Sequence, residues 1–199
     1  MTPKGKRIVK YVDGNMMDYM IYDLVPPHAK VLWERTQEFD FNRPPMHPSQ
    51  LATSLLHTMA EKGGLGLSAN QVGLPYRVFV MGHGKTFFCF FNPEIVETTG
   101  ENDDIQEGCL TYPNLFLRVK RASRIKVRWR DERNIEREET FDGFTARIIQ
   151  HEMDHLNGTC FTKRVPAIKL QRAKDRVKIH KRRARDAAKL ERFEKAQKA

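Results

Sequence analysis

Apolar residues recur at helical spacing in one stretch of the first third of the chain, residues 49–62. They lie three or four positions apart and share one face of a helix: Leu51, Leu55, Leu56 and Met59. The proline-rich segment 43–48 precedes this stretch, and a Gly-Gly pair follows it, so both ends are marked. A shorter helix is predicted over residues 27–35, whereas residues 1–25 show no firm period.

Strand patterns dominate the middle of the chain. Residues 77–81 and 86–91 flank the glycine-containing segment 82–85, which predicts a hairpin. In residues 125–130 apolar and basic side chains alternate, as in a strand with one solvated face. After a polar turn, residues 135–141 form the next predicted strand.

The pattern changes from period two to helical after the Asp142-Gly143 pair. Four side chains then fall on one helical face, at steps of four, three and four: Phe144, Ile148, His151 and His155. Strands that frame a single buried helix indicate an α+β domain rather than a βαβ unit.

Charge divides the 199-residue chain into two parts. The net charge is +10, yet residues 163–199 alone carry 15 Lys and Arg against 4 Asp and Glu. Residues 1–162 are nearly neutral, with 20 basic and 21 acidic side chains. We therefore expect a catalytic domain over 1–162 and a basic helical tail over 163–199.

Composition excludes several classes of protein. Hydrophobic residues make up 40% and charged residues 30%, as is usual for a soluble globular protein. No apolar run approaches the roughly 18–20 residues that span a bilayer, so no membrane partner is expected. The N-terminus lacks the apolar stretch of a signal peptide, and three cysteines are too few for a disulfide framework. These features predict a cytoplasmic protein with reduced thiols.

The most specific chemical motif is His151-Glu152-Met153-Asp154-His155. On a helix, histidines at i and i+4 can bind one divalent ion, and Glu152 lies where it can take a proton from water. The alternative is a buried amphipathic helix that carries two histidines by chance.

A catalytic ion usually has three protein ligands. The metzincin pattern would need a histidine where Phe161 stands, and the downstream carboxylates lie in the charged tail. The third ligand is therefore expected upstream, and Cys109 within residues 107–113 is the strongest candidate, because thiolates bind Zn²⁺ and Fe²⁺ well. A lone cysteine is more often a small buried apolar residue, which is our interpretation of Cys89 and Cys160.

Residues 64–71, GLGLSANQ, match the dinucleotide fingerprint only formally. A helix rather than a strand precedes them, and residues 84–92 lack the acidic side chain that the fingerprint needs. A glycine-rich turn that ends in Gln71 can instead present an amide N–H to a developing oxyanion. A plain tight turn with a solvated glutamine is the alternative.

Three motifs occur in the order GLGLSANQ, EGCLTYP and QHEMDHLNG, spread over residues 64–161. This set resembles that of the bacterial-type peptide deformylases. The resemblance implies an α+β fold with antiparallel sheets around the HExxH helix and a C-terminal helix. It also implies a metal-dependent hydrolase that removes the formyl group from the N-terminal formyl-methionine of new polypeptides.

The resemblance assigns roles to individual residues. The metal ligands would be Cys109, His151 and His155. The general base, and later acid, would be Glu152, and the oxyanion hole would be formed by Gln71 and the Leu110 backbone N–H. The substrate would contact Gly66, Leu65, Ile105, Glu107, Phe144 and Ile148. The bound ion in this family is commonly Fe²⁺, with Zn²⁺, Ni²⁺ or Co²⁺ as substitutes.

Three positions depart from the usual family pattern: Ser68, Thr111 and Arg147. The first two changes are mild. Arg147 lies one turn before His151, where some members carry an apolar pocket residue. None of the three removes a catalytic group.

The tail is predicted to be a charged helix with a thin apolar stripe through Leu170, Ala173, Val177, Ala184 and Leu190. Its basic residues are either a solvated face or a contact with ribosomal RNA, and by resemblance we favour the ribosome. Two other functions stay open: an HExxH zinc endopeptidase, and a non-catalytic ribosome- or RNA-binding protein with a structural metal. The latter would need a fourth ligand, which Cys160 could supply.

Overall fold

The computed structural model describes residues 3–12, 15–83 and 86–197. The strands are β1 Gly5–Val12, β2 Asn15–Tyr22, β3 Gly66–Ser68, β4 Val78–His83, β5 Thr86–Cys109, β6 Tyr112–Arg130 and β7 Glu136–Asp142. The helices are α1 Pro48–Glu61, α2 Gly143–Leu156 and α3 Ala167–Gln197, with 3₁₀ turns η1 Lys30–Leu32, η2 Ala69–Val72 and η3 Phe161–Lys163.

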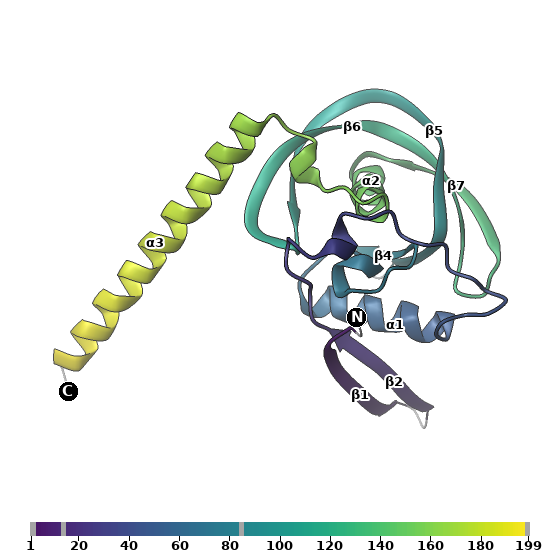
Figure 1. The fold of residues 1–199 in the computed structure, drawn as a ribbon, viewed down its shortest axis with the longest axis horizontal. Coiled ribbons are helices and arrows are strands. Elements are labelled where there is room, and N and C mark those ends of the chain that lie inside the picture. Colours follow the sequence, from purple (N-terminus) through teal and green to yellow (C-terminus); the bar gives the residue numbers. More distant parts are fainter. Residues whose placement is uncertain (1–2, 13–14, 84–85, 198–199) are drawn as a thin grey trace.

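One antiparallel sheet and one helix make up the centre of the fold. The sheet has the strand order β3-β4-β5-β6-β7, with every neighbouring pair antiparallel. The long strands β5 and β6 curve over α2, which carries the HExxH motif and lies within the curve (Figure 1). The α+β architecture with antiparallel sheets around this helix is thus confirmed.

Strands β5 and β6 are far longer than the sequence pattern predicts. They contain 24 and 19 residues, whereas the predicted strands covered only 86–91 and 125–130. Their ladder is interrupted by register shifts, and an extra residue in one strand bends it and increases its twist. These irregularities allow a long ribbon to wrap around a helix instead of extending flat.

Two apolar clusters hold the helices against the sheet. The cluster around α1 contains Leu51, Leu55, Leu67, Val78, Val80 and Phe91. The cluster around α2 contains Phe79, Phe90, Ile125, Val127, Trp129 and Ile149. Alternate residues of β4 and of the start of β5 therefore point to opposite faces, so this hairpin forms the wall between α1 and α2.

The N-terminal hairpin is absent from the sequence prediction. Strand β1 pairs with β2 as a separate two-stranded sheet, with residues 13–14 outside the described range. It is anchored on α1, where the backbone N–H groups of Met20 and Tyr22 donate to Ser54 Oγ (3.0 Å) and Thr58 Oγ1 (2.9 Å). These contacts span more than 30 residues, so a local pattern does not reveal them.

The predicted helix over 27–35 is wrong in extent, because only the 3₁₀ turn Lys30–Leu32 forms there. Its neighbours make non-helical hydrogen bonds: Trp33 Nε1 donates to Pro27 O, six residues before it, and Thr36 N–H donates to the distant Leu156 O at 2.9 Å. Tertiary bonds satisfy these groups in place of helical ones. The other helix prediction, 49–62, agrees with α1 within one residue.

Helix α3 is attached to the body by its first turns only. Leu170, Ala173 and Val177 pack against the cluster that contains Leu115, Leu117 and Val119 of β6. The remainder extends away from the body (Figure 1), with Ala184 exposed, while the Leu190 side chain lies outside the described residues. Among the described helices, none is long and apolar enough to cross a membrane.

Gly158 follows α2 and has a left-handed backbone, as does Gly143 at the start of α2. Comparing the two tests how tightly the segment after α2 is packed. Gly143 has φ +55° and open space where a Cβ would lie, whereas Gly158 has φ +68° and a Cβ there would lie 2.7 Å from the Glu34 carbonyl carbon. Gly143→Ala should cost about 1–2 kcal/mol, the strain of a non-glycine residue at positive φ. Gly158→Ala should cost about 3 kcal/mol or more, because backbone must also move. Urea unfolding at equal metal loading measures both; equal losses would contradict the close packing.

Candidate metal centre and active site

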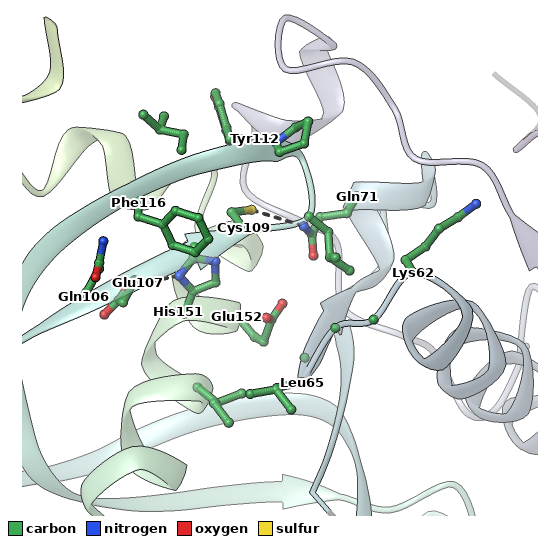
Figure 2. Close-up of a pocket in the computed structure, with 18 of the residues that line it drawn as sticks. Lys62, Leu65, Gln71, Gln106, Glu107, Cys109, Tyr112, Phe116, His151 and Glu152 are labelled. Atoms are coloured by element: carbon green, nitrogen blue, oxygen red, sulfur yellow. Dashed lines mark hydrogen bonds and ion pairs between the residues drawn. The ribbon is translucent and has the colours of Figure 1, made fainter. Parts of the chain in front are cut away.

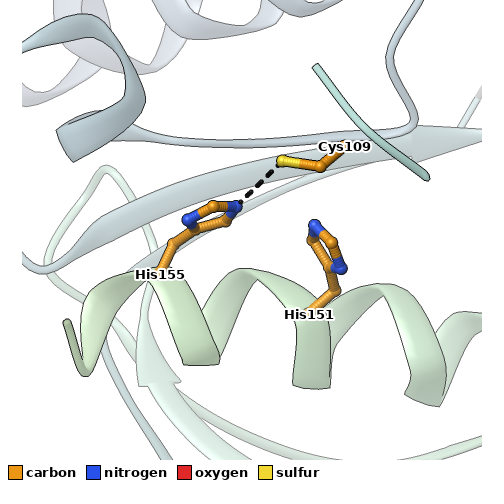
Figure 3. Close-up of side chains that lie close together, drawn as sticks. All are labelled: Cys109, His151 and His155. Carbon is orange, nitrogen blue, oxygen red and sulfur yellow. Dashed lines mark hydrogen bonds between the residues drawn. The ribbon is translucent and has the colours of Figure 1, made fainter. Parts of the chain in front are cut away.

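Helix α2 and the end of strand β5 bring three potential metal ligands together. Cys109, His151 and His155 each offer one ligand atom, and these atoms all lie within 4.8 Å of one another. Cys109 Sγ lies 3.3 Å from His155 Nε2, and both imidazoles project from the same side of α2 (Figure 3). The i and i+4 spacing supplies two ligands, and the long ribbon brings the third from 42 residues upstream of His151.

Cys109 is positioned by the tight turn that joins β5 to β6. It pairs with Tyr112 across this turn, with Leu110 and Thr111 at the tip. Burial by itself would raise the pKa of the Cys109 thiol, but the charge of His155 and a hydrogen bond with His151 outweigh it and hold that pKa well below its usual value. The thiolate is the form of cysteine that binds metals.

The donor set fits a divalent transition metal. One sulfur and two imidazole nitrogens suit Zn²⁺ and Fe²⁺, and three protein ligands leave a position open for water or substrate. Burial lowers the pKa of His151, but the neighbouring Cys109 and Glu107 outweigh burial and raise it to about 9. The cluster therefore attracts positive charge, which a divalent ion would supply.

Glu107 forms a buried ionic centre behind His151. Its carboxylate accepts hydrogen bonds from His151 Nδ1 (3.0 Å), Arg121 Nε (2.6 Å) and Arg147 Nη1 (2.6 Å). Burial alone would raise the pKa of Glu107, but His151 and Arg121 outweigh it and lower that pKa to about 2. The carboxylate fixes the proton of His151 on Nδ1, so Nε2 is free to bind a metal.

Arg121 and Asp154 extend this centre, and sequence reasoning missed both. Arg121 Nη1 donates to Asp154 Oδ2 at 2.9 Å, and Arg164 also pairs with Asp154. Arg121 follows Leu115, Leu117 and Val119 at period two, all of them buried. That alternation was a signal that Arg121 points inward, although it does not reveal its partners.

Glu152 lies in the site with its carboxylate constrained on two sides. It is 4% exposed, Ser68 Oγ donates to its Oε2 at 2.5 Å, and a Cβ at Gly66 would lie 2.5 Å from its Oε1. Desolvation raises the pKa of Glu152, although the charges of His151 and His155 oppose this. A carboxyl group transfers protons efficiently in both directions when its pKa lies close to the pH at which the enzyme works, and a raised pKa is a shift in that direction.

Gln71 is held with its amide nitrogen towards Cys109. Its Oε1 accepts from the Ser68 backbone N–H at 2.9 Å, and its Nε2 lies 3.0 Å from Thr111 Oγ1 and 3.5 Å from Cys109 Sγ. Figure 2 shows Gln71, Cys109 and Glu152 around the same space. Ser68, one of the three positions that depart from the usual family pattern, thus contacts Gln71 through its backbone and Glu152 through its hydroxyl.

These side chains line a cavity of about 500 Å³. The predicted substrate residues in its wall are Leu65, Gly66, Glu107, Phe144 and Ile148, with Leu110 at the turn. Ile105 does not lie in this wall, because β5 contributes to it only from Gln106 onward, and its side chain is 39% exposed. Arg147, which stands at an expected pocket position, also lines the cavity, and so do Lys62 and Phe116, which were not expected there.

Cys160 does not belong to the group of three candidate ligand atoms. Its Sγ is 3.7 Å from His155 Nδ1, on the opposite side of the ring from Cys109. In the part of the chain that the structure describes, the grouped ligands are Cys109, His151 and His155 alone. A closed site with two cysteines and two histidines, which the structural-metal alternative requires, is therefore not supported.

The sequence profile of the polypeptide deformylase family matches residues 21–171, about three quarters of the chain. The chain belongs to the polypeptide deformylase family. The peptide deformylase of Hyphomonas neptunium is 41% identical over 139 residues, which cover 67% of this chain and 79% of that protein. The Thermotoga maritima enzyme is 41% identical over 115 residues, covering 58% of this chain and 70% of that protein.

Solved peptide deformylase structures share the fold. The Synechococcus elongatus enzyme in complex with actinonin has a TM-score of 0.71 and 34% identity, covering 77% of this chain and 84% of that one. The Acinetobacter baumannii class I type b enzyme bound to Met-Ala-Ser has a TM-score of 0.68 and 31% identity, covering 72% and 97%. Peptide deformylases are metal-dependent enzymes that remove the N-formyl group from nascent peptides, and this chain is one of them. The endopeptidase and non-catalytic alternatives are therefore not retained.

Gly66 and Gly64 form a matched test of the space around Glu152. A Cβ at Gly66 would meet the Glu152 carboxylate at 2.5 Å, and Ser68 holds that carboxylate from the other side. A Cβ at Gly64 would meet the flexible end of Leu110 at 2.7 Å and the Gly66 carbonyl oxygen at 3.2 Å, but not Glu152. Gly66→Ala should lower kcat/KM by about 100-fold with metal content unchanged, because it displaces Glu152, the predicted general base. Gly64→Ala should lower kcat/KM only a few-fold; equal effects would contradict the tight fit.

Proposed function

We propose that Cys109 Sγ, His151 Nε2 and His155 Nε2 hold one divalent ion at which the formyl group of the substrate is hydrolysed. The observation that carries this proposal is the convergence of these three ligand atoms within 4.8 Å. Cys109 and His151 line a cavity that Glu152 and Gln71 also line. When bound, the ion supplies Lewis acidity that polarises a carbonyl and lowers the pKa of water. We assign Fe²⁺ as the ion in the cell, with Zn²⁺, Ni²⁺ or Co²⁺ as substitutes that the same donors accept.

Glu152 is the proton carrier in this proposal. It accepts a proton from the attacking water and returns it to the nitrogen of the departing amine. Its burial and the upward direction of its pKa support both steps, since a carboxyl shifted in this direction is protonated more readily than an exposed one. The Ser68 hydroxyl, which donates to Oε2, keeps the carboxylate oriented between the two transfers.

Gln71 Nε2 and the Leu110 backbone N–H stabilise the oxyanion that develops on the formyl oxygen. The Gln71 amide is fixed by the bond that its Oε1 accepts from Ser68, so its nitrogen faces Cys109 and the cavity. Leu110 follows Cys109 in the tight turn, which supports a donor adjacent to the metal ligand. Each donor of this kind is typically worth about 3 kcal/mol in the transition state.

The cavity accommodates the methionine side chain of a formyl-methionyl nascent peptide. Leu65, Phe144 and Ile148 supply apolar surface, and Gly66 leaves room for the peptide backbone beside Glu152. The Acinetobacter baumannii relative bound to Met-Ala-Ser supports a peptide with N-terminal methionine as occupant. Ile105 stays a predicted substrate contact that would need β5 to move toward the cavity.

The basic tail, residues 163–199, is assigned to the ribosome, and residues 1–162 to catalysis. Beyond Val177, helix α3 projects from the body with a row of exposed basic residues. Such a helix suits rRNA phosphates, which bind Lys and Arg with a strong salt dependence. Because formylated chains emerge from ribosomes, we place the enzyme in the cytoplasm.

Replacement of Glu152 tests the assignment of the proton carrier. Glu152→Gln preserves the shape of the side chain but removes the base, so kcat should fall by about 100- to 10,000-fold. Metal content, measured by atomic emission, should remain at the wild-type level, and Glu139→Gln on an exposed strand should change neither quantity. Near-normal turnover of a formyl-Met-Ala-Ser peptide by Glu152→Gln would rule out the mechanism.

Three basic residues in the projecting part of α3 test the ribosome contact. Replacing Lys181, Arg182 and Arg183 with Gln should weaken co-sedimentation with ribosomes at least tenfold and reduce its salt dependence, because about three phosphate contacts are lost. Activity on a short formyl-Met peptide should stay unchanged, since these residues lie beyond the packed turns of α3. The control replaces three exposed lysines of the N-terminal segment: Lys4, Lys6 and Lys10. Equal ribosome binding by both triple variants would argue against the tail.

A further inference from the structure

The two histidines of the candidate metal centre have different partners at Nδ1, the ring nitrogen that is not assigned to the metal. His151 Nδ1 has the Glu107 carboxylate at 3.0 Å. His155 Nδ1 has the Cys160 thiol, with Sγ at 3.7 Å, a distance that suits a hydrogen bond to sulfur. Metal-binding histidines nearly always place this second nitrogen on an acceptor, usually a carboxylate or a carbonyl. The thiol of Cys160 differs from both of these usual partners.

Cys160 is held rigidly behind His155. After α2 ends, Gly158 takes a left-handed conformation and the chain turns back, with Thr159 N–H donating to Asp154 O at 2.9 Å. Cys160 is fully buried, and its carbonyl accepts from Lys163 N–H at 2.9 Å as η3 begins. The thiol therefore cannot move far from the imidazole without disturbing this turn.

Within the described residues, Cys160 Sγ is the partner found for His155 Nδ1. Cys109 Sγ lies at the other ring nitrogen, Nε2. The backbone carbonyl of His155 accepts from Asn70 Nδ2 at 2.6 Å and from Gly158 N–H at 3.1 Å. His155 is completely buried, so bulk solvent does not reach Nδ1. A buried N–H without an acceptor is costly, which gives the thiol a role beyond filling space.

A second polar group lies against the same sulfur. Burial, and then the adjacent Cys160, raise the pKa of the Tyr112 phenol. The sulfur therefore has polar neighbours, an imidazole and a phenol, and not an apolar cluster alone. The interpretation of Cys160 as a small buried apolar residue accounts for its burial but not for these two neighbours.

We propose that Cys160 is a positioning residue for the metal centre: its sulfur accepts the Nδ1 proton of His155 and so keeps Nε2 unprotonated and directed at the ion. This inference rests on the proposed function in one respect, that His155 binds the ion through Nε2. Cys160 itself touches neither ion nor substrate. Because a thiol is a weaker acceptor than the carboxylate that supports His151, His155 is the ligand more sensitive to loss of its partner.

The test uses the full-length protein loaded with Co²⁺, whose visible absorption reports its ligands. Co²⁺ release to excess EDTA and the absorption spectrum are measured for wild type, Cys160→Ala and Cys160→Ser. Cys160→Ala should release Co²⁺ about 10- to 100-fold faster and shift the ligand-field bands, as expected when a metal ligand loses its supporting partner. Cys160→Ser should stay within a few-fold of wild type, because its hydroxyl can accept the same proton.

Cys89→Ala is the matched control, since it removes a partly buried thiol that packs in the cluster around α1 and should leave release and spectrum unchanged. If Cys160→Ala does not fold, Cys160→Val and Cys160→Thr replace the first pair, because they share a shape and differ in one hydroxyl. Wild-type release and spectrum in the variant without an acceptor would overturn the inference, as would equal loss in both members of a pair.

A different result would contradict the proposed function itself, independently of Cys160. If wild-type protein takes up Co²⁺ without the thiolate absorption that Cys109 should produce, the assignment of the metal ligands is wrong, whatever the Cys160 variants do. If wild type shows that absorption and the variants match it, only the role of Cys160 is lost.

Discussion

The buried carboxylate of Glu107 connects the sheet to the helix that carries the chemistry. It extends from β5 and accepts hydrogen bonds from Arg121 on β6 and from Arg147 and His151 on α2. A buried charge is tolerated only when it is paired and hydrogen-bonded. These contacts therefore fix the positions of β5, β6 and α2 relative to the Glu107 carboxylate. The curvature of the β5–β6 ribbon, the position of α2 and the orientation of one metal ligand are therefore coupled through one side chain.

The reactive groups follow from that arrangement. Two residues beyond Glu107, the same strand delivers Cys109 to the face of α2 where His151 and His155 project. The segment β3–η2 approaches from the other side, where Gly66 leaves room for Glu152 and Ser68 bonds to both Glu152 and Gln71. Short-range motifs supply the reactive side chains, and long-range ion pairs bring the motifs together.

Helix α2 and its histidines could be predicted from sequence because ligand spacing and helical periodicity are both local properties. Cys109 and Gln71 became candidates through their motifs, although only the fold brings them together. The centre of the β5–β6 ribbon escaped prediction because most of its β5 residues from Glu97 to Gln106 are exposed and polar, without an apolar alternation. Arg121 escaped prediction because its partners lie on other elements. Cys160 is buried as expected, but its contact with His155 escaped prediction because an irregular turn separates it from α2. Net charge taken over the whole chain likewise suggests a nucleic-acid-binding protein, whereas its concentration in residues 163–199 separates it from the chemistry.

The central claim is that a single divalent ion is bound by Cys109, His151 and His155. X-ray absorption at the metal edge of the zinc-loaded enzyme tests it most directly, because sulfur scatters differently from nitrogen and oxygen. The account predicts one sulfur and two imidazoles around the ion in wild type, and loss of the sulfur contribution in Cys109→Ser. A site without sulfur, or a sulfur signal that persists in Cys109→Ser, would contradict it.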